Sequence, residues 1–244
     1  MGGTRLPGKV LASIRGRPML QCQMERLEQA RTLDSIVIAI PDTSANDMLA
    51  ELCFTWDYAL YRGSETDVLG RYLGAAEAAD ADTVVRVTAD CPLIDPGVID
   101  DCVRLFQRGG VMGPFDFVAN NLQPTFPHGL DCEVMSRGTL AIAEAKATTA
   151  YDREHVTPWI TRADAGGAFL RLGNLACPTG NLSRYRLTVD YPEDLAVIRA
   201  IYERFGQRYF TTREAIAFLG VRPDLVAMNA SRRLPTIWNV VGTA

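Results

Sequence analysis

The sequence predicts an α/β fold in which helices flank a mostly parallel sheet, with a small antiparallel excursion. Segments with the apolar period of a helix alternate along the chain with short β-branched runs. Two of these runs end in an aspartate and are followed by a helix that begins with a proline. Apolar residues make up 48% of the 244 positions, which is enough to bury a full core. This order is typical of βαβ units, which bind ligands where loops leave the carboxyl ends of the strands.

The predicted helices share an apolar stripe that repeats every three or four residues. They span residues 19–30, 44–55, 67–79, 96–107, 137–147, 153–162, 192–205 and 212–218. Thr43 supplies a start signal for the second helix, and Pro96 and Pro192 stand in the first turns of two others.

The predicted strands are short β-branched runs between these helices. They span residues 35–40, 83–88, 117–120 and 185–189. The stretch from 122 to 133 contains Pro124, Pro127 and Gly129 and is irregular. We expect this stretch to lead into the antiparallel excursion on the substrate side.

Composition excludes several function classes. The net charge of −4 argues against a surface that coats nucleic acid and against a polybasic membrane anchor. The longest apolar runs fall far short of the ~18 residues that a membrane helix needs, and no signal peptide is recognised. The six cysteines contain no CxxC pair, so we expect reduced, mostly buried thiols. We therefore expect a cytoplasmic protein without nucleic-acid or membrane partners.

The N-terminus carries the pattern of a phosphate-binding loop. Of 25 basic residues only Lys9 and Lys146 are lysine, so Lys9 stands out in a chain that otherwise uses arginine. Lys9 follows three glycines and Arg5, and no acidic residue precedes Glu25. Glycines let backbone N–H groups approach an anion. The loop is not a P-loop, because Val10 stands where Ser or Thr would bind magnesium, and it lacks the GxGxxG spacing.

Two aspartates, Asp90 and Asp190, follow predicted strands and precede helices that begin with proline. Carboxylates at such strand ends are suitable Mg²⁺ ligands, and the two could converge on one ion if their strands are close. The alternative is that each aspartate only caps the turn before its helix.

Five motifs in order, GGTRLPGK, TADCPLIDP, HGLD, REHVTP and LTVDYPEDL, resemble the cytidylyltransferases of the spore-coat polysaccharide SpsF type. These are relatives of the CMP-Kdo and CMP-sialate synthetases, and the resemblance covers residues 1 to about 215. It implies a Rossmann-like nucleotide-diphospho-sugar transferase fold. It also implies the use of CTP with Mg²⁺, release of pyrophosphate and a homodimer.

The resemblance also implies roles for individual residues. Arg5 and Lys9 would hold the triphosphate as catalytic cations, and Asp90 and Asp190 would hold Mg²⁺. The nucleotide-binding candidates are Gly2, Gly3, Thr4, Ser64, Asp67 and Arg71. Thr66 could equally cap a helix there. The acceptor-binding candidates are His128, Asp131, Glu133, Arg153 and His155. His155 could equally be a buried structural residue.

On this basis we expect a nucleotidyltransferase domain over residues 1–220, with an acceptor and dimer insertion at about 120–180 and a tail over 221–244. The expected reaction transfers CMP from CTP to a sugar acid or related acceptor in surface polysaccharide biosynthesis. One alternative is a metal-dependent glycosyltransferase of related fold. Another is a non-catalytic nucleotide-binding subunit.

The resemblance further implies a hydrophobic strand before the glycine-rich loop, whereas this sequence begins at Met1 inside that loop. Such a strand would fix where the amides of the loop point. We expect a chain extended upstream to be more stable and more active, or else this chain to be an impaired synthetase.

Overall fold

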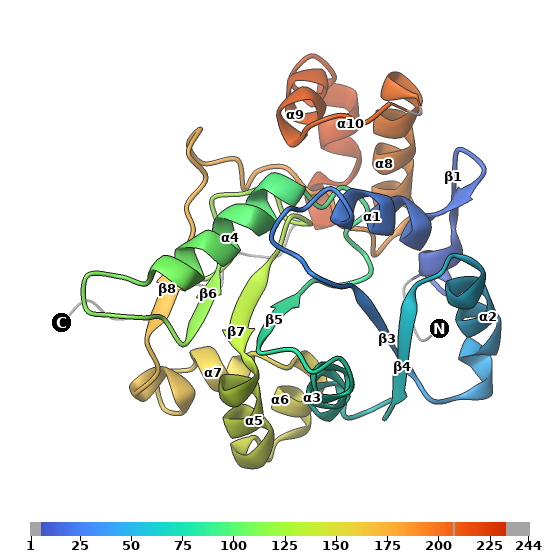
Figure 1. Ribbon diagram of the computed structural model, residues 1–244. Coiled ribbons are helices and arrows are strands. Elements are labelled where there is room, and N and C mark those ends of the chain that lie inside the picture. Colours follow the sequence, from blue (N-terminus) through green and yellow to red (C-terminus); the bar gives the residue numbers. More distant parts are fainter. Residues whose placement is uncertain (1–5, 207, 233–244) are drawn as a thin grey trace.

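Two sheets form the central layer of the computed structural model, which describes residues 6–206 and 208–232 (Figure 1). The smaller sheet pairs β3 (Val37–Pro41) with β4 (Ala59–Gly63) in parallel. The larger sheet has the order β5-β7-β6-β8, with bounds Thr83–Arg86 for β5, Glu133–Ser136 for β7, Phe117–Ala119 for β6 and Leu172–Asn174 for β8. In this sheet β7 runs antiparallel to both of its neighbours, while β6 and β8 are parallel. The strand β7 is therefore the antiparallel excursion that the irregular stretch predicted.

Helices cover both faces of the sheets (Figure 1). One face is covered by α1 (Met19–Leu27), α2 (Asp47–Thr55) and α4 (Pro96–Arg108), whose apolar side chains form one buried cluster with Val118 and Val134. The opposite face is covered by α3 (Val68–Ala78), α5 (Arg137–Lys146), α6 (Ala150–His155) and α7 (Pro158–Thr161). There Phe117, Ala119 and Met135 face the helices, as the alternation of side chains along a strand requires.

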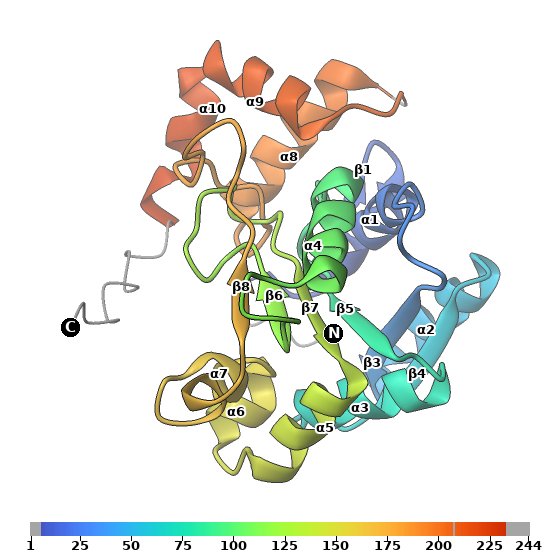
Figure 2. The same cartoon turned by 60° about the vertical axis from the view of Figure 1, so that its left-hand side comes forward.

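A third buried cluster lies at one end of the sheet layer, where α8 (Pro192–Phe205), α9 (Thr212–Gly220) and α10 (Pro223–Met228) group together (Figure 2). These helices pack on Leu93 and on the extended segment around Leu187 and Val189. The segment therefore lies between α8 and the rest of the core. The domain boundary expected at residue 220 and the insertion expected at 120–180 stay predictions.

The predicted helices all occur, with one interruption. The helix expected over 153–162 is divided into α6 and α7, because Val156 has a positive φ of 74° and Pro158 begins a new helix. Asp67, and not Thr66, caps α3: its carboxylate accepts the Gly70 N–H at 2.9 Å.

The strand expected over 185–189 is not a strand of either sheet. Its backbone pairs first with His128, through the Tyr185 carbonyl and the Leu187 N–H, and then with Asp90, through the Val189 N–H. The segment thus bridges two separate loops instead of extending one ladder. Two further strands, β4 and β8, and a short hairpin of β1 (Ser13–Ile14) and β2 (Arg17–Pro18) were not expected from the sequence.

Candidate active site

Lys9 is held at the centre of the site by three acceptors. It begins a short 3₁₀ helix (Lys9–Leu11) after Gly8, which has a positive φ of 69°. Its ammonium donates to Asp90 Oδ2 at 3.0 Å, to the Val189 carbonyl at 2.8 Å and to Asp190 Oδ1 at 2.9 Å. These bonds use all three ammonium hydrogens. Burial opposes the charge, but the two carboxylates outweigh it and raise the pKa of Lys9 above its ordinary value.

Asp90 is fixed by its neighbours on the loop after β5. The Thr88 hydroxyl donates to Asp90 Oδ1 at 2.6 Å, which leaves Oδ2 for Lys9. The Asp90 carbonyl accepts the Val189 N–H at 2.8 Å. These contacts tie the end of β5 to the segment that carries Asp190, so both aspartates converge on one cation although they are a hundred residues apart.

Asp190 is held by a buried arginine that no sequence motif had singled out. Arg186, with 2% of its side chain exposed, donates to Asp190 Oδ2 at 2.8 Å and pairs with Asp194 through two nitrogens at 2.8 and 3.0 Å. Burial alone would raise the pKa of Asp190, but Lys9 and Arg186 hold it below its ordinary value. Asp190 is therefore a carboxylate that stays ionised and oriented.

The two aspartates fit a hard divalent cation. Asp90 and Asp190 each give one oxygen to the Lys9 ammonium, while Thr88 and Arg186 bind their other oxygens. The ammonium is therefore a cation bound between the two carboxylates. Within residues 6–206 and 208–232 no group of three or more His, Cys, Asp or Glu side chains could hold a metal. Mg²⁺ accepts such a sparse set, because it takes one or two carboxylates and completes its shell with water and substrate phosphates.

The HGLD motif adjoins this centre through Arg186. Arg186 has only donors, so His128 Nδ1, at 3.1 Å, accepts and the ring proton lies on Nε2. Nε2 faces the Asp131 carboxylate at 3.8 Å. Burial raises the pKa of Asp131, and although His128 lowers it, nearby Glu133 and Asp90 raise it further. His128 and Asp131 are both partly exposed, so a bound molecule can reach them.

Gly129 makes this arrangement possible. It has a positive φ of 105°, and a Cβ at this position would lie 2.4 Å from the Thr188 nitrogen. The HGLD loop therefore packs directly against the backbone of the segment that carries Arg186 and Asp190.

The remaining acceptor candidates are engaged within the protein. Glu133 pairs with Arg86 and accepts the Thr157 hydroxyl at 3.0 Å. Arg153 pairs with Asp67 and with Glu144. His155 stacks tilted on Tyr151 with ring centroids 4.4 Å apart. His155 is exposed, so its interpretation as a buried structural residue is wrong.

The nucleotide candidates after β4 form a local network. The Ser64 hydroxyl accepts the Asp67 N–H at 3.0 Å, and the Arg71 guanidinium donates to the Ser64 carbonyl. Through Asp67 this network continues to Arg153. The three acceptors of the Lys9 ammonium belong to other segments, so they do not connect this network to Lys9. The role of the network in nucleotide binding therefore stays a prediction. Gly2, Gly3, Thr4 and Arg5 lie outside the described residues.

Three residues of the site, Arg186, Asp194 and Asn229, were not expected from the sequence. Arg186 and Asp194 stand four residues to either side of Asp190: Asp194 belongs to the LTVDYPEDL motif and Arg186 directly precedes it, so their spacing could have indicated them. Asn229 carried no signal, because it lies in a segment without a recognised motif.

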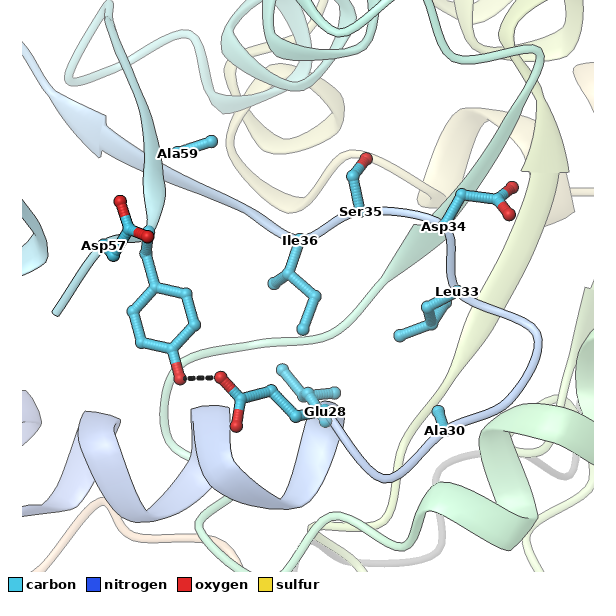
Figure 3. A pocket seen from close by; sticks show the side chains of 10 residues that line it. Glu28, Ala30, Leu33, Asp34, Ser35, Ile36, Asp57 and Ala59 are labelled. Carbon is cyan, nitrogen blue, oxygen red and sulfur yellow. Dashed lines mark hydrogen bonds between the residues drawn. The ribbon is translucent and has the colours of Figure 1, made fainter.

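A separate cavity of about 350 Å³ lies at the amino ends of β3 and β4, beside the end of α1 (Figure 3). Tyr58 and Glu28 form a hydrogen bond at its edge, and Leu33 and Ile36 line it (Figure 3). None of the predicted site residues lines this cavity.

Among the described residues, the helices are too short or too polar to cross a membrane.

Comparisons with known proteins agree with this architecture. A family model described as cytidylyltransferase matches residues 1–210. The spore coat polysaccharide biosynthesis protein SpsF of Bacillus subtilis is 32% identical over 232 residues, which is 92% of each chain. An 8-amino-3,8-dideoxy-manno-octulosonate cytidylyltransferase of Shewanella frigidimarina is 36% identical over 44% of each chain. A cytidylyltransferase structure from Leptospira borgpetersenii superposes with a TM-score of 0.86 at 28% identity, covering 93% of this chain and 92% of that one. The predicted fold class is confirmed.

We predict that Gly129→Ala disrupts the contact between the HGLD loop and the 185–189 segment. The matched control is Gly180→Ala, because Gly180 also has a positive φ, of 97°, but a Cβ there would meet no heavy atom within 4 Å. Gly129→Ala should lower the melting temperature by roughly 6–12 °C more than the control, because a destabilisation of about 3 kcal/mol corresponds to such a shift at this chain length. Equal melting temperatures would contradict the close approach.

Proposed function

Because this chain belongs to the cytidylyltransferase family, we propose that it transfers CMP from CTP to a sugar acid or a related hydroxylated acceptor. The observation that carries the proposal is the convergence of Asp90 and Asp190 on the Lys9 ammonium, beside a glycine-rich loop. The octulosonate named for the Shewanella relative supports a sugar acid as acceptor. The name of the Bacillus relative supports a role in surface polysaccharide biosynthesis.

In the proposed reaction an acceptor oxygen attacks the α-phosphorus of CTP. A new P–O bond forms to the acceptor, and the bond to the β-phosphate oxygen breaks, so that pyrophosphate leaves. Such a reaction needs no nucleophile on the protein, and catalysis consists of positioning and neutralisation of negative charge. Lys9 supplies a point charge for the phosphates, and Arg5 is proposed as its partner.

Asp90 and Asp190 are proposed to hold Mg²⁺. When bound there, the ion neutralises phosphate oxygens and orients the triphosphate. Arg186 keeps Asp190 turned toward this position, and Thr88 does the same for Asp90.

His128 and Asp131 are proposed to face the acceptor. Their partial exposure and their link to Arg186 support this role. The raised pKa of Asp131 makes it a stronger base than an ordinary carboxylate, which supports it as the group that receives the acceptor proton.

The other candidates are proposed in two groups. The nucleoside would be bound by Ser64, Asp67 and Arg71. The acceptor would be bound by Glu133, Arg153 and His155. The family resemblance supports a homodimer, and the composition of the sequence supports a cytoplasmic location.

The test is a pyrophosphate-release screen of each nucleoside triphosphate with Mg²⁺ against a panel of acidic sugars. We expect release with CTP and one class of acidic sugar. Turnover of a finished nucleotide sugar without pyrophosphate release would instead identify a glycosyltransferase. A CTP-dependent thermal shift without turnover for any acceptor would identify a non-catalytic binding subunit.

We predict that Lys9→Ala lowers kcat at saturating CTP on the order of 10²–10³-fold, as expected for the loss of one charged contact to a reacting phosphate. Lys9→Arg should fail as well, because a planar guanidinium cannot replace a compact ammonium among three converging acceptors. The control is Lys146→Ala, which removes the other lysine of the chain at an exposed position. A near-normal kcat for Lys9→Ala would remove Lys9 from the phosphate site.

We predict that Lys9→Met binds Mn²⁺ more tightly than the wild-type protein when no nucleotide is present. The Lys9 ammonium occupies the two carboxylate oxygens that are not bound by Thr88 or Arg186, so a metal must displace it. Removal of the ammonium should lower the Mn²⁺ dissociation constant roughly tenfold, which corresponds to about 1.4 kcal/mol of binding free energy. The measurement is a titration followed by Mn²⁺ electron paramagnetic resonance. An unchanged or weaker affinity would show that Asp90 and Asp190 do not share a metal.

A further inference from the structure

Residues 221–232 fold back onto α8 and the segment before it. In both views α10 lies beside α8 and α9 (Figures 1 and 2). Leu225 of α10 is buried in the same apolar cluster as Leu187 and Val189, the neighbours of Asp190. The family model ends at residue 210, so this contact is made by a part of the chain beyond the family match.

Asn229 follows α10 directly and is 3% exposed. Its side-chain nitrogen donates to the Arg186 carbonyl at 3.1 Å and to Asp194 Oδ1 at 3.0 Å. Both amide hydrogens are therefore used on two residues of the LTVDYPEDL region.

The partners of Asn229 are the groups that fix Asp190. Asp194 is fully buried, and its Oδ2 accepts the N–H groups of Asp190 and Tyr191 at 3.0 Å each. One nitrogen of Arg186 bridges Asp194 Oδ2 and Asp190 Oδ2. Asn229 thus contacts Arg186 and Asp194, and these two residues in turn contact Asp190, whose carboxylate faces Lys9.

Loss of the Asn229 amide would leave the Arg186 carbonyl and one lone pair of Asp194 Oδ1 without a donor. Buried polar groups without partners are costly, so the segment would shift until they find new ones. Any such shift moves Arg186, and with it the orientation of Asp190. Buried side chains that hold metal ligands in this way change metal affinity or activity by about 10–100-fold when they are replaced.

We propose that Asn229 is a positioning residue that keeps Arg186 and Asp194 in the arrangement that holds Asp190 toward the proposed metal. It follows that the segment of residues 221–232 is part of the working site and not an appended tail. The metal role rests on the proposed function, whereas the contacts of Asn229 do not.

The test compares Asn229→Ala and Asn229→Asp with two controls. Asn229→Ala removes both donors, and Asn229→Asp keeps the shape but turns an acceptor toward Asp194. Met228→Ala changes the exposed neighbour. Leu225→Ala loosens the packing of α10 without touching a hydrogen bond of this network. Each variant is measured for melting temperature and for Mn²⁺ binding by electron paramagnetic resonance, well below its melting temperature and without substrate.

We expect Asn229→Ala and Asn229→Asp to raise the Mn²⁺ dissociation constant at least about tenfold, and to raise the Mg²⁺ concentration needed for half-maximal turnover by a similar factor. Leu225→Ala should lower the melting temperature but leave Mn²⁺ affinity within about twofold of wild type. If both Asn229 variants fail to fold, Asn229→Ser, which keeps one donor, is measured in the same way.

Asn229 variants that lower the melting temperature but bind Mn²⁺ as the wild type does would overturn the proposal, because the residue would then only stabilise the fold. Failure of the proposed function is a different result: the wild-type protein would release no pyrophosphate from CTP, whatever the effect of Asn229 on Mn²⁺ binding.

Discussion

The structure depends on one interaction, the contact of the Lys9 ammonium with carboxylates from two segments that are distant in the sequence. Asp90 and Asp190 would repel each other at this separation without a cation between them. The protein brings them together because the Asp90 carbonyl accepts the Val189 N–H, which fixes the two chain segments side by side. The Lys9 ammonium supplies the positive charge between them, and under the proposed function a metal ion takes its place when substrate binds.

The surrounding side chains would keep the aspartates ordered during this proposed exchange. Thr88 and Arg186 each hold one oxygen of an aspartate, and the opposite oxygens face Lys9. Arg186 is itself held by buried Asp194, whose charge it compensates. The HGLD loop reaches this group only because Gly129 lets two backbones touch. The HGLD loop and Asp190 are thus connected through one arginine.

Local patterns predicted the two aspartates, since a strand, an aspartate and a helix beginning with proline are neighbours in sequence. The same patterns could not identify β4 and β8, whose segments ALYRG and LGN contain no β-branched residue. The β-branched segment 185–189 was expected to be a strand, yet it has two different partners and forms no ladder. The ion pair of Arg153 with Asp67 could not be predicted either, because the two residues are 86 positions apart in the sequence. Asn229 could not be predicted, because its contacts with Arg186 and Asp194 arise only from where α10 places it.

The most direct measurement is an anomalous diffraction map from crystals of the protein grown with CTP and Mn²⁺. We expect one strong manganese peak between the carboxylates of Asp90 and Asp190, with Lys9 Nζ moved from both aspartates onto a phosphate oxygen. A manganese peak that touches neither aspartate, or a bound nucleotide with Lys9 still on both carboxylates, would contradict the exchange of cations at the centre of this site.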